Sequence, residues 1–537
     1  MHAHTADASS LGSVTGWHLL AIVGISTAFQ SLFIHHGIAW LFDEGWPLYA
    51  AMKLQAGGVL YGDIVFPFPP GHLVPAWIAY AIDPPGIILA RVIYAAFTVA
   101  LCAASYLLAR RITTPTFALL AGLLLAVAAP RSHLSHLLFG YRYLVFSVLA
   151  LLAFAWCLRA GDPRQVRRGM FVAGALAGVA LFFRLTPAFA VSCGIGIAVL
   201  TTSRDWRDWL HDWLAYALGL VLVSLPVLAW FASTVGLETV WREVVTRIVA
   251  LQSAQSLSSP PLSLLPETGD RGDVYRWFVG LQYRAYIVLY AGYLLGLVGL
   301  WLRGLRQGRR FEHSLLLAIV VWGGVSLLRA LGRSDDHHLM SALPPACLVL
   351  AHGVGLLARR GLDAFRPSDF SRRTALAGLC VVVWLAWAYA MRVDFYVPVQ
   401  NRGVVPVQST GGEVLVTAPR VASRIDEVVR TLVRVTGPQD TVLDTTGAPL
   451  FHLLTGRRGP GGIDVITPGM FLTPEEEKAF VARLQAAPPA AIVWSSKNFD
   501  GRPDRSLGRT APALSKWVRE AYEEAVRIDR YRILVPR

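Results

Sequence analysis

Charged residues are scarce in this chain. Only 16% of its 537 residues are Asp, Glu, Lys or Arg, whereas 54% are hydrophobic. So large an apolar share excludes an ordinary soluble globular protein. A bilayer core about 30 Å thick needs about 20 apolar residues per helical span, and the chain supplies such runs repeatedly up to Met391. The composition therefore predicts a polytopic helical membrane protein.

Cysteine is rare as well, with five residues in the chain. All five fall in or at the ends of apolar segments, without the spacing of a metal site: Cys102, Cys157, Cys193, Cys347 and Cys380. We interpret them as small core residues and expect no disulfide. The sequence before Trp17 also lacks a basic segment and a cleavage site, so we expect the first helix to remain as an uncleaved anchor.

About eleven apolar segments are predicted to span the membrane. They cover residues 17–34, 87–108, 115–129, 143–158, 170–183, 186–200, 213–231, 282–302, 315–328, 340–357 and 375–390. Residues 1–392 are thus expected to form the membrane domain, with a long first external loop at 35–86. Within that loop, residues 46–55 and 72–82 mix apolar and polar side chains, as helices lying in the membrane interface do.

Arginines fall in every second connecting loop, as short cytoplasmic loops require. They are Arg110 and Arg111; Arg159, Arg164, Arg167 and Arg168; Arg204 and Arg207; Arg303, Arg306, Arg309 and Arg310; and Arg359, Arg360, Arg366, Arg372 and Arg373. This alternation predicts a cytoplasmic N-terminus and places the tail after Met391 outside. The same arginines account for most of the net charge of +14. We therefore attribute the charge to topology and anionic lipid headgroups, and expect no nucleic acid partner.

The tail, residues 393–537, is long enough for one small domain. Its alternating strand and helix patterns predict a compact extracytoplasmic α/β domain, with a helix at 513–526 before a final strand. The TGRRGPGG stretch has neither a Lys-Ser/Thr after it nor the G-x-G-x-x-G spacing, so we interpret it as a turn. No catalytic motif stands out in this domain.

Two adjacent carboxylates, Asp43 and Glu44, follow the first span directly. Further along the loop come Leu54, Gly57, Tyr61 and Asp63, and then the Pro-Pro-Gly turn at 69–71. This arrangement resembles the GT-C superfamily of integral-membrane glycosyltransferases, over the region from Trp17 to Met391. Relatives in that superfamily transfer mannose to protein, aminoarabinose to lipid A or arabinose to cell-wall glycan. The tail, with LTGRRGPGGIDVITPGM followed by TPEEE, is similar to that of uncharacterised bacterial members.

The resemblance implies an enzyme of the bacterial inner (plasma) membrane. Such enzymes move a sugar, here a hexose or pentose, from a polyprenyl-phosphate donor to a hydroxyl acceptor on the external face, with inversion. The acceptor would be a cell-envelope glycan, a lipid or a protein. A phosphate leaving group needs positive charge rather than a general acid, whereas the acceptor hydroxyl needs a general base.

We assign Asp43 as that base and Glu44 as the residue that orients Asp43, the acceptor or a cation. The alternative for Asp43 is an N-cap of the following helix, although a cap alone does not explain the companion motif. Tyr61 and Asp63 are candidate substrate contacts, with an ordinary turn as the alternative. Some relatives require a divalent cation near the acidic pair and others do not, so a cation near Asp43 stays open.

The donor phosphate needs a cationic partner, for which the external side offers three arginines. Arg184 interrupts an apolar stretch, where a lipid-facing charge would cost about 2.5–3.5 kcal/mol. We propose Arg184 or Arg142 as the phosphate contact and Arg333 as a third candidate, whose alternative is an ion pair with Asp335 or Asp336. His337 is a candidate substrate contact. A metal held jointly by His133, His136, His337 and His338 is the weaker interpretation, because zinc sites have identifiable spacing.

Two other classes of function remain open. A transporter or flippase for lipid-linked sugars predicts inverted repeats and polar residues at mid-membrane, but the sequence shows no internal repeat and its polar residues gather on one side. A non-catalytic relative could use its soluble domain as a receptor or scaffold. The presence of Asp43 weighs against that role.

Overall fold

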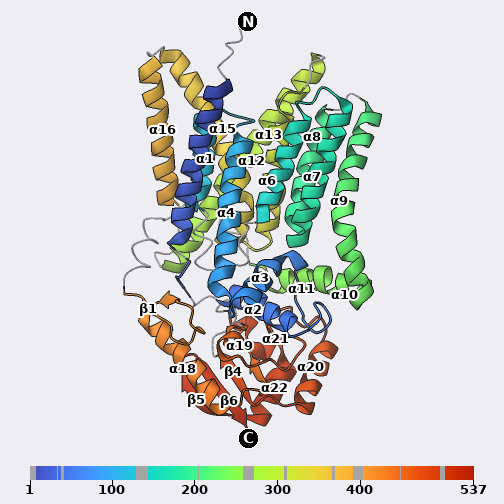
Figure 1. Cartoon of the computed structure of the whole chain (residues 1–537), viewed down its shortest axis with the longest axis vertical. Coiled ribbons are helices and arrows are strands. Elements are labelled where there is room, and N and C mark those ends of the chain that lie inside the picture. The colour runs from blue at the N-terminus through green and yellow to red at the C-terminus, as the bar shows by residue number, and fades with distance from the viewer. Residues whose placement is uncertain are drawn as a thin grey trace.

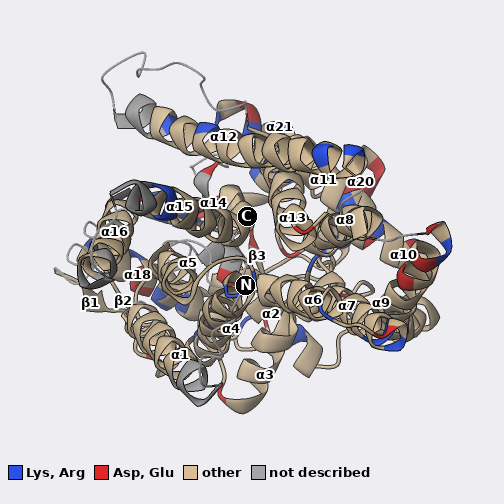
Figure 2. Ribbon diagram, turned by 90° about the horizontal axis from the view of Figure 1, so that it is seen from above, with Lys and Arg blue, Asp and Glu red and all other residues tan. Residues whose placement is uncertain are grey.

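The computed structural model describes residues 8–32, 34–37, 41–128, 143–202, 205–257, 271–307, 311–365, 369–390, 403–447, 449–495 and 502–537. Two parts follow one another along the long axis of the molecule, a bundle of long helices at the N-terminal end and an α/β part at the C-terminal end (Figure 1). Viewed from above, most of the helical ribbon carries neither positive nor negative side chains (Figure 2). This distribution fits helices that lie in an apolar medium.

Every segment predicted to span the membrane coincides with a helix. These helices are α1 (Ala8–Ser31), α4 (Ile87–Ala109), α5 (Pro115–Ala128), α6 (Leu144–Cys157), α7 (Pro163–Phe183), α8 (Leu185–Thr202), α9 (Trp206–Val235), α12 (Arg271–Arg306), α13 (Ser314–Leu331), α15 (Leu343–Phe365) and α16 (Asp369–Ala390). Within the described residues, seven helices are long and apolar enough to cross a membrane, and three apolar helices are shorter. The fold class is thus a polytopic helical membrane protein, while the number of crossings stays a prediction.

Glycines let neighbouring helices of the bundle approach closely. A Cβ atom on Gly174 of α7 would overlap the carbonyl oxygen of Tyr216 in α9, and one on Gly219 of α9 would overlap that of Phe171 in α7. Gly194 of α8 meets the carbonyl of Ala318 in α13 in the same way. Small residues serve helix packing in membranes because apolar lipid supplies little hydrophobic drive for association.

Short helices lie between the bundle and the C-terminal part (Figure 1). In the first loop these are α2 (Leu41–Gln55), η1 (Pro70–His72) and α3 (Val74–Ile82), and in the fourth they are α10 (Leu237–Trp241), η4 (Arg242–Thr246) and α11 (Arg247–Ala254). The fifth loop contains α14 (Asp336–Leu339) and η5 (Met340–Ala342). Both helices predicted for the first loop are therefore present.

The C-terminal part is built on a mixed sheet. Its elements are β1 (Val405–Pro406), β2 (Val416–Thr417), α18 (Pro419–Val435), β3 (Val442–Asp444), α19 (Leu450–Thr455), α20 (Pro474–Ala486), β4 (Ala491–Ser495), η7 (Pro503–Arg505), α21 (Leu507–Thr510), α22 (Pro512–Ala521), β5 (Tyr522–Ile528) and β6 (Tyr531–Pro536). The larger sheet of the described residues has the order β3-β4-β6-β5, with β3 parallel to β4 and the other pairs antiparallel. The predicted boundary at 392/393 falls outside the described residues.

One predicted element of this part is wrong. The helix expected at 513–526 ends at Ala521, and the residues from Tyr522 to Ile528 form the edge strand β5. Pairing with β6 fixes this strand, and Glu524 on its exposed side accepts a hydrogen bond from Arg532 at 2.6 Å. Charged side chains are common on edge strands because they discourage further pairing. That charge pattern made the segment look like an exposed helix.

Candidate active site

The acidic pair lies at the start of α2, between the bundle and the C-terminal part (Figure 1). The helix begins at Leu41, which puts Asp43 inside its first turn rather than at the N-cap. The N-cap interpretation of Asp43 is therefore wrong. A carboxylate in the first turn is favoured by the helix dipole. The side chain of Asp43 lies outside the described part of the chain, so its role as base stays a prediction.

Glu44 forms a buried ion pair with Arg91 of α4. Nε of Arg91 donates to Oε1 of Glu44 at 2.9 Å, and Nη2 donates to Oε2 at 2.7 Å. The side chain of Arg91 is 1% exposed, and that of Glu44 is 6% exposed. Such two-pronged pairing of guanidinium with carboxylate is strong and geometrically specific. Both oxygens of Glu44 are thus engaged.

Arg91 also holds the chain that leads into α2. Its Nη1 donates to the carbonyl oxygens of Ile34 and His36 at 2.7 and 3.2 Å, and its Nη2 donates to that of Gly37 at 2.8 Å. With the two bonds to Glu44, all five N–H groups of the guanidinium are used. Arg91 therefore fixes both sides of the segment that carries Asp43. The sequence interpretation missed it, although a charge inside an apolar span signals a functional or structural role.

Tyr61 and Asp63 make contacts within their own turn. Tyr61 has a positive φ of 68°, and its hydroxyl donates to the carbonyl oxygen of Phe68 at 2.7 Å. Oδ2 of Asp63 accepts a hydrogen bond from the backbone N–H of Val59 at 3.0 Å. These contacts are those of the turn interpretation. A direct role for either residue in substrate binding stays a prediction.

Arg184 reaches from the junction of α7 and α8 to the first external loop. Its Nη1 donates to the hydroxyl of Tyr143 at 3.2 Å, and its guanidinium lies 5.3 Å from the centre of the Phe68 ring. The ring of His72 stacks on that of Phe68 at 5.3 Å. Burial, with a smaller contribution from the nearby Arg184, lowers the pKa of His72 to about 3. His72 is therefore neutral at physiological pH, and the positive charge here belongs to Arg184.

The Pro-Pro-Gly turn brings these groups together. A Cβ on Gly71 would lie 2.6 Å from the carbonyl oxygen of Phe182, at the end of α7. Only glycine allows the backbone of the turn to approach α7 this closely. The turn thus seats Phe68 and His72 beside Arg184, which follows Phe182 by two residues. The sequence signalled the turn but not its packing partner.

Arg333 lies in the fifth loop and pairs with its own neighbours. Its Nε contacts Oδ2 of Asp335 at 3.3 Å, and its Nη1 donates to Oε1 of Gln255 at 2.6 Å. Oδ1 of the same Asp335 is bonded to Nδ1 of His338 at 2.7 Å. The ion pair that was the alternative for Arg333 is therefore present. A contact with donor phosphate stays a prediction.

Several predicted residues lie outside the described part of the chain. Residues 129–142 are not described, and they include Arg142, His133 and His136. The side chain of His337 is likewise not described. Among the described residues, no group of three or more His, Cys, Asp or Glu is placed to hold a metal ion. A cation at Asp43 stays an open question.

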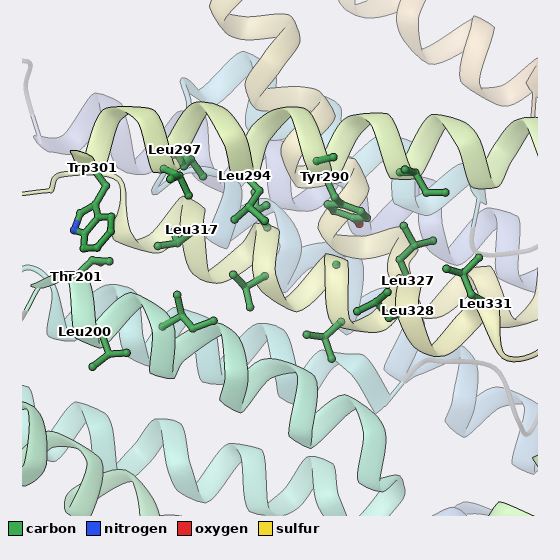
Figure 3. A pocket seen from close by; sticks show the side chains of 18 residues that line it. Leu200, Thr201, Tyr290, Leu294, Leu297, Trp301, Leu317, Leu327, Leu328 and Leu331 are labelled. Carbon is green, nitrogen blue, oxygen red and sulfur yellow. The ribbon is translucent and has the colours of Figure 1, made fainter. Parts of the chain in front are cut away.

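An apolar groove runs along the bundle between α8, α12 and α13 (Figure 3). Its volume is about 570 Å³, and it extends from Thr201 and Trp301 at one end to Leu331 at the other. The hydroxyl of Tyr290, which lines the groove, is used in a bond to the carbonyl oxygen of Ala342 at 2.6 Å. The groove thus suits a long hydrocarbon chain. Its Leu331 end lies two residues from Arg333 in the sequence.

Comparison with solved structures identifies the fold. ArnT from Cupriavidus metallidurans bound to undecaprenyl phosphate is similar over 97% of this chain and 98% of its own, with a TM-score of 0.57 at 15% identity. The apo state of the same protein gives a TM-score of 0.58 at 16% identity. These are membrane glycosyltransferases of the GT-C superfamily. The chain has the GT-C fold.

A second solved structure is similar to this chain with a lower TM-score. The oligosaccharyltransferase AglB from Archaeoglobus fulgidus, in complex with an inhibitory peptide and a dolichol-phosphate, is similar over 89% of this chain and 69% of its own. Its TM-score is 0.52 at 13% identity. No family model matches the sequence, and neither does any curated protein. At these identities, the similarity shows the fold alone.

Proposed function

We propose that this chain is an inverting glycosyltransferase that moves a sugar from a polyprenyl-phosphate donor to a hydroxyl acceptor outside the membrane. One observation carries the proposal. In a GT-C fold, an acidic pair stands at the start of helix α2, and Arg91 holds Glu44 of this pair and the chain before the helix. A site that positions a carboxylate this firmly is suited to general base catalysis.

The contacts of Glu44 separate the roles of the two carboxylates. Both oxygens of Glu44 accept hydrogen bonds from Arg91, which holds this carboxylate in place. Asp43 is then the group that accepts the proton of the acceptor hydroxyl. The freed oxygen attacks the anomeric carbon, and the bond from that carbon to the phosphate oxygen breaks with its electron pair on the phosphate. Attack opposite the leaving group inverts the anomeric centre.

Positive charge for the leaving phosphate is available on the external side. Arg184 lies next to the first loop through Tyr143 and Phe68, and we assign it as the main phosphate contact. The apolar groove between α8, α12 and α13 supports a polyprenyl chain as the carrier of the sugar. ArnT and AglB have been solved with undecaprenyl phosphate and dolichol-phosphate, respectively, which supports the same donor class here.

The arrangement of the loops supports the orientation. The helix ends that lead into the arginine-bearing junctions, those of α8, α12 and α15, lie at the end of the bundle that holds the N-terminus, opposite the C-terminal part (Figure 1). We therefore place the N-terminus in the cytoplasm and the acidic pair, with the C-terminal part, outside. A reporter that is active only outside the cytoplasm, fused after Arg537, is expected to be active. An inactive but stable fusion would contradict this orientation.

The lipid and glycan profile of cells lacking the protein tests the proposal. We expect one sugar to disappear from an envelope glycan, lipid or protein, and its polyprenyl-phosphate form to accumulate. The intact gene should restore the profile, whereas an Asp43→Asn variant produced at the same level should not. Full restoration by Asp43→Asn would contradict catalysis and favour a transporter or scaffold.

A further inference from the structure

Helix α2 is attached to the C-terminal part as well as to the bundle. Nζ of Lys53, near its end, contacts Oδ2 of Asp464 at 2.7 Å. The side chains are 15% and 4% exposed, so the contact is largely shielded from water. The two residues are 411 positions apart in the sequence. This ion pair therefore joins the loop of the membrane domain to a distant part of the chain.

Tyr49 makes a second attachment one helical turn earlier. It is 1% exposed, its hydroxyl accepts the backbone N–H of Gly459 at 2.6 Å, and its ring stacks on His452 at 4.5 Å. Burial lowers the pKa of His452 to about 3, so this ring is neutral. The Tyr49 contact is therefore a neutral, directional one that complements the charged contact of Lys53.

The backbone of α2 itself touches the C-terminal part beside the acidic pair. A Cβ on Gly45 would lie 2.9 Å from the backbone nitrogen of Leu450, at the start of α19. Pro47 lies between this contact and Tyr49. Because proline has no N–H, it cannot donate to the carbonyl of Asp43, and the first turn of α2 is held less by its own helix. Contacts with the C-terminal part lie on both sides of Pro47, at Gly45 and at Tyr49.

We infer that the C-terminal part is a positioning element of the active site, which fixes α2 through Gly45, Tyr49 and Lys53 and thereby the backbone of the first turn, to which Asp43 belongs. The catalytic consequence rests on the proposed function. Catalytic groups must be held close to their reacting geometry, and a displacement of about 1 Å can cost about 100-fold in rate. The C-terminal part thus serves the reaction without touching the substrate.

Hydrogen exchange in the full-length protein in detergent tests the attachment without any activity assay. Asp464→Asn removes the charge opposite Lys53, and Tyr49→Phe removes only a hydroxyl and preserves the packing. We expect amide exchange in residues 41–55 to rise about tenfold in Asp464→Asn, and less in Tyr49→Phe. Asp529→Asn is the matched control, because it makes the same change at an ion pair with Arg424 away from α2. Its exchange in 41–55 should equal that of the parent.

Steady-state kinetics tests the consequence. We expect kcat to fall about tenfold or more in Asp464→Asn while the KM for donor and acceptor stays unchanged, and Lys53→Arg to retain most of the rate. Parental exchange in 41–55 in both Asp464→Asn and Tyr49→Phe would overturn the inference, and so would increased exchange with an unchanged kcat. Absence of transfer by the parent itself would instead contradict the proposed function, and the exchange result would still decide the attachment.

Discussion

The two ends of α2 are held in different ways. At its start, Glu44 accepts two hydrogen bonds from Arg91 of α4, which uses its other N–H groups on backbone carbonyls of the chain before α2. Near its end, Nζ of Lys53 contacts one oxygen of Asp464 at 2.7 Å and the carbonyl oxygen of Asp63 at 3.1 Å, and part of the side chain reaches water. The ion pair at the start is made with the membrane domain, and the ion pair near the end is made with the C-terminal part. The difference indicates that the bundle sets the place of the acidic pair and the C-terminal part refines it.

Replacing Arg91 should have the largest effect on stability. Arg91→Met leaves Glu44 buried without its partner, which typically costs about 3–5 kcal/mol. We expect a strongly lowered thermal midpoint of the purified protein, and partial recovery in the double variant Arg91→Met/Glu44→Gln. Arg110→Met, in the loop after α4, removes bonds to neutral hydroxyls only and should cost much less. An Arg91→Met protein as stable as the parent would contradict the stronger attachment at the start of α2.

The stability of the C-terminal part should depend on pH through Asp444. Burial raises the pKa of Asp444 to about 7 from its ordinary value of 3.8. Between these values, the unfolded state loses the proton that the folded state keeps, so stability falls as pH rises from about 4 to 7 and then levels off. Asp444→Asn cannot ionise and should gain a few kcal/mol relative to the parent over this range.

Thermal midpoints of the full-length parent and variant at pH 4.5 and 7.5 measure this effect. The thermal midpoint of the parent should lie further below that of Asp444→Asn at pH 7.5 than at pH 4.5. A constant difference between the two proteins would mean that Asp444 does not titrate in this range, and would contradict the prediction.

Arg184→Ala tests donor binding without changing the contacts that hold α2. Hydrogen bonds to charged groups contribute about 1.5–3 kcal/mol, so we expect kcat/KM for the donor to fall roughly 10- to 100-fold. The KM for the acceptor should change little. Lys at this position should restore the charge but only part of the activity, because it lacks the planar fork of arginine. If the donor kinetics are unchanged, Arg184 is not the phosphate contact, and Arg142 and Arg333 are the next candidates.

Lys53→Met should have the smallest effect on stability, about 1 kcal/mol. Burial already raises the pKa of Asp464, and Lys53 works against that rise. Once Lys53 is gone, Asp464 can take up a proton instead of remaining as an unpaired buried charge. Comparison of thermal midpoints with those of Arg91→Met checks the ranking of the two attachments. A loss as large as that of Arg91→Met would contradict it.

The sequence predicted the bundle well because membrane spans leave a strong local signal. Each apolar run became a helix, and the Asp-Glu pair was placed by its position after the first span. The sequence did not reveal Arg91, which looks like an isolated charge within a run until its partner, 47 residues away, is brought beside it by folding. Nor did it reveal the contacts of Tyr49 and Lys53, which lie about 410 residues from their partners.

The C-terminal part was predicted less completely for a related reason. Helix α18 passed unnoticed, and β5 was mistaken for the end of a helix. An edge strand with charged side chains has little of the alternation that marks a buried strand. Its identity comes from pairing with β6, which lies in the final residues of the chain. A strand that depends on pairing with another segment is difficult to find in one sequence. A helix whose composition reflects the membrane around it is easier to find.

The central claim is that Asp43 acts as the general base of a glycosyl transfer. The most direct measurement is the transfer of labelled sugar from polyprenyl phosphate by purified protein, using the donor identified from the cell profile. Asp43→Asn should lower kcat about 10²- to 10⁴-fold, with folding and donor binding retained. Asp83→Asn, which changes an exposed carboxylate of the same loop at the end of α3, serves as the control and should cost far less. Transfer by Asp43→Asn within about threefold of the parent, a difference of less than 1 kcal/mol, would contradict the account.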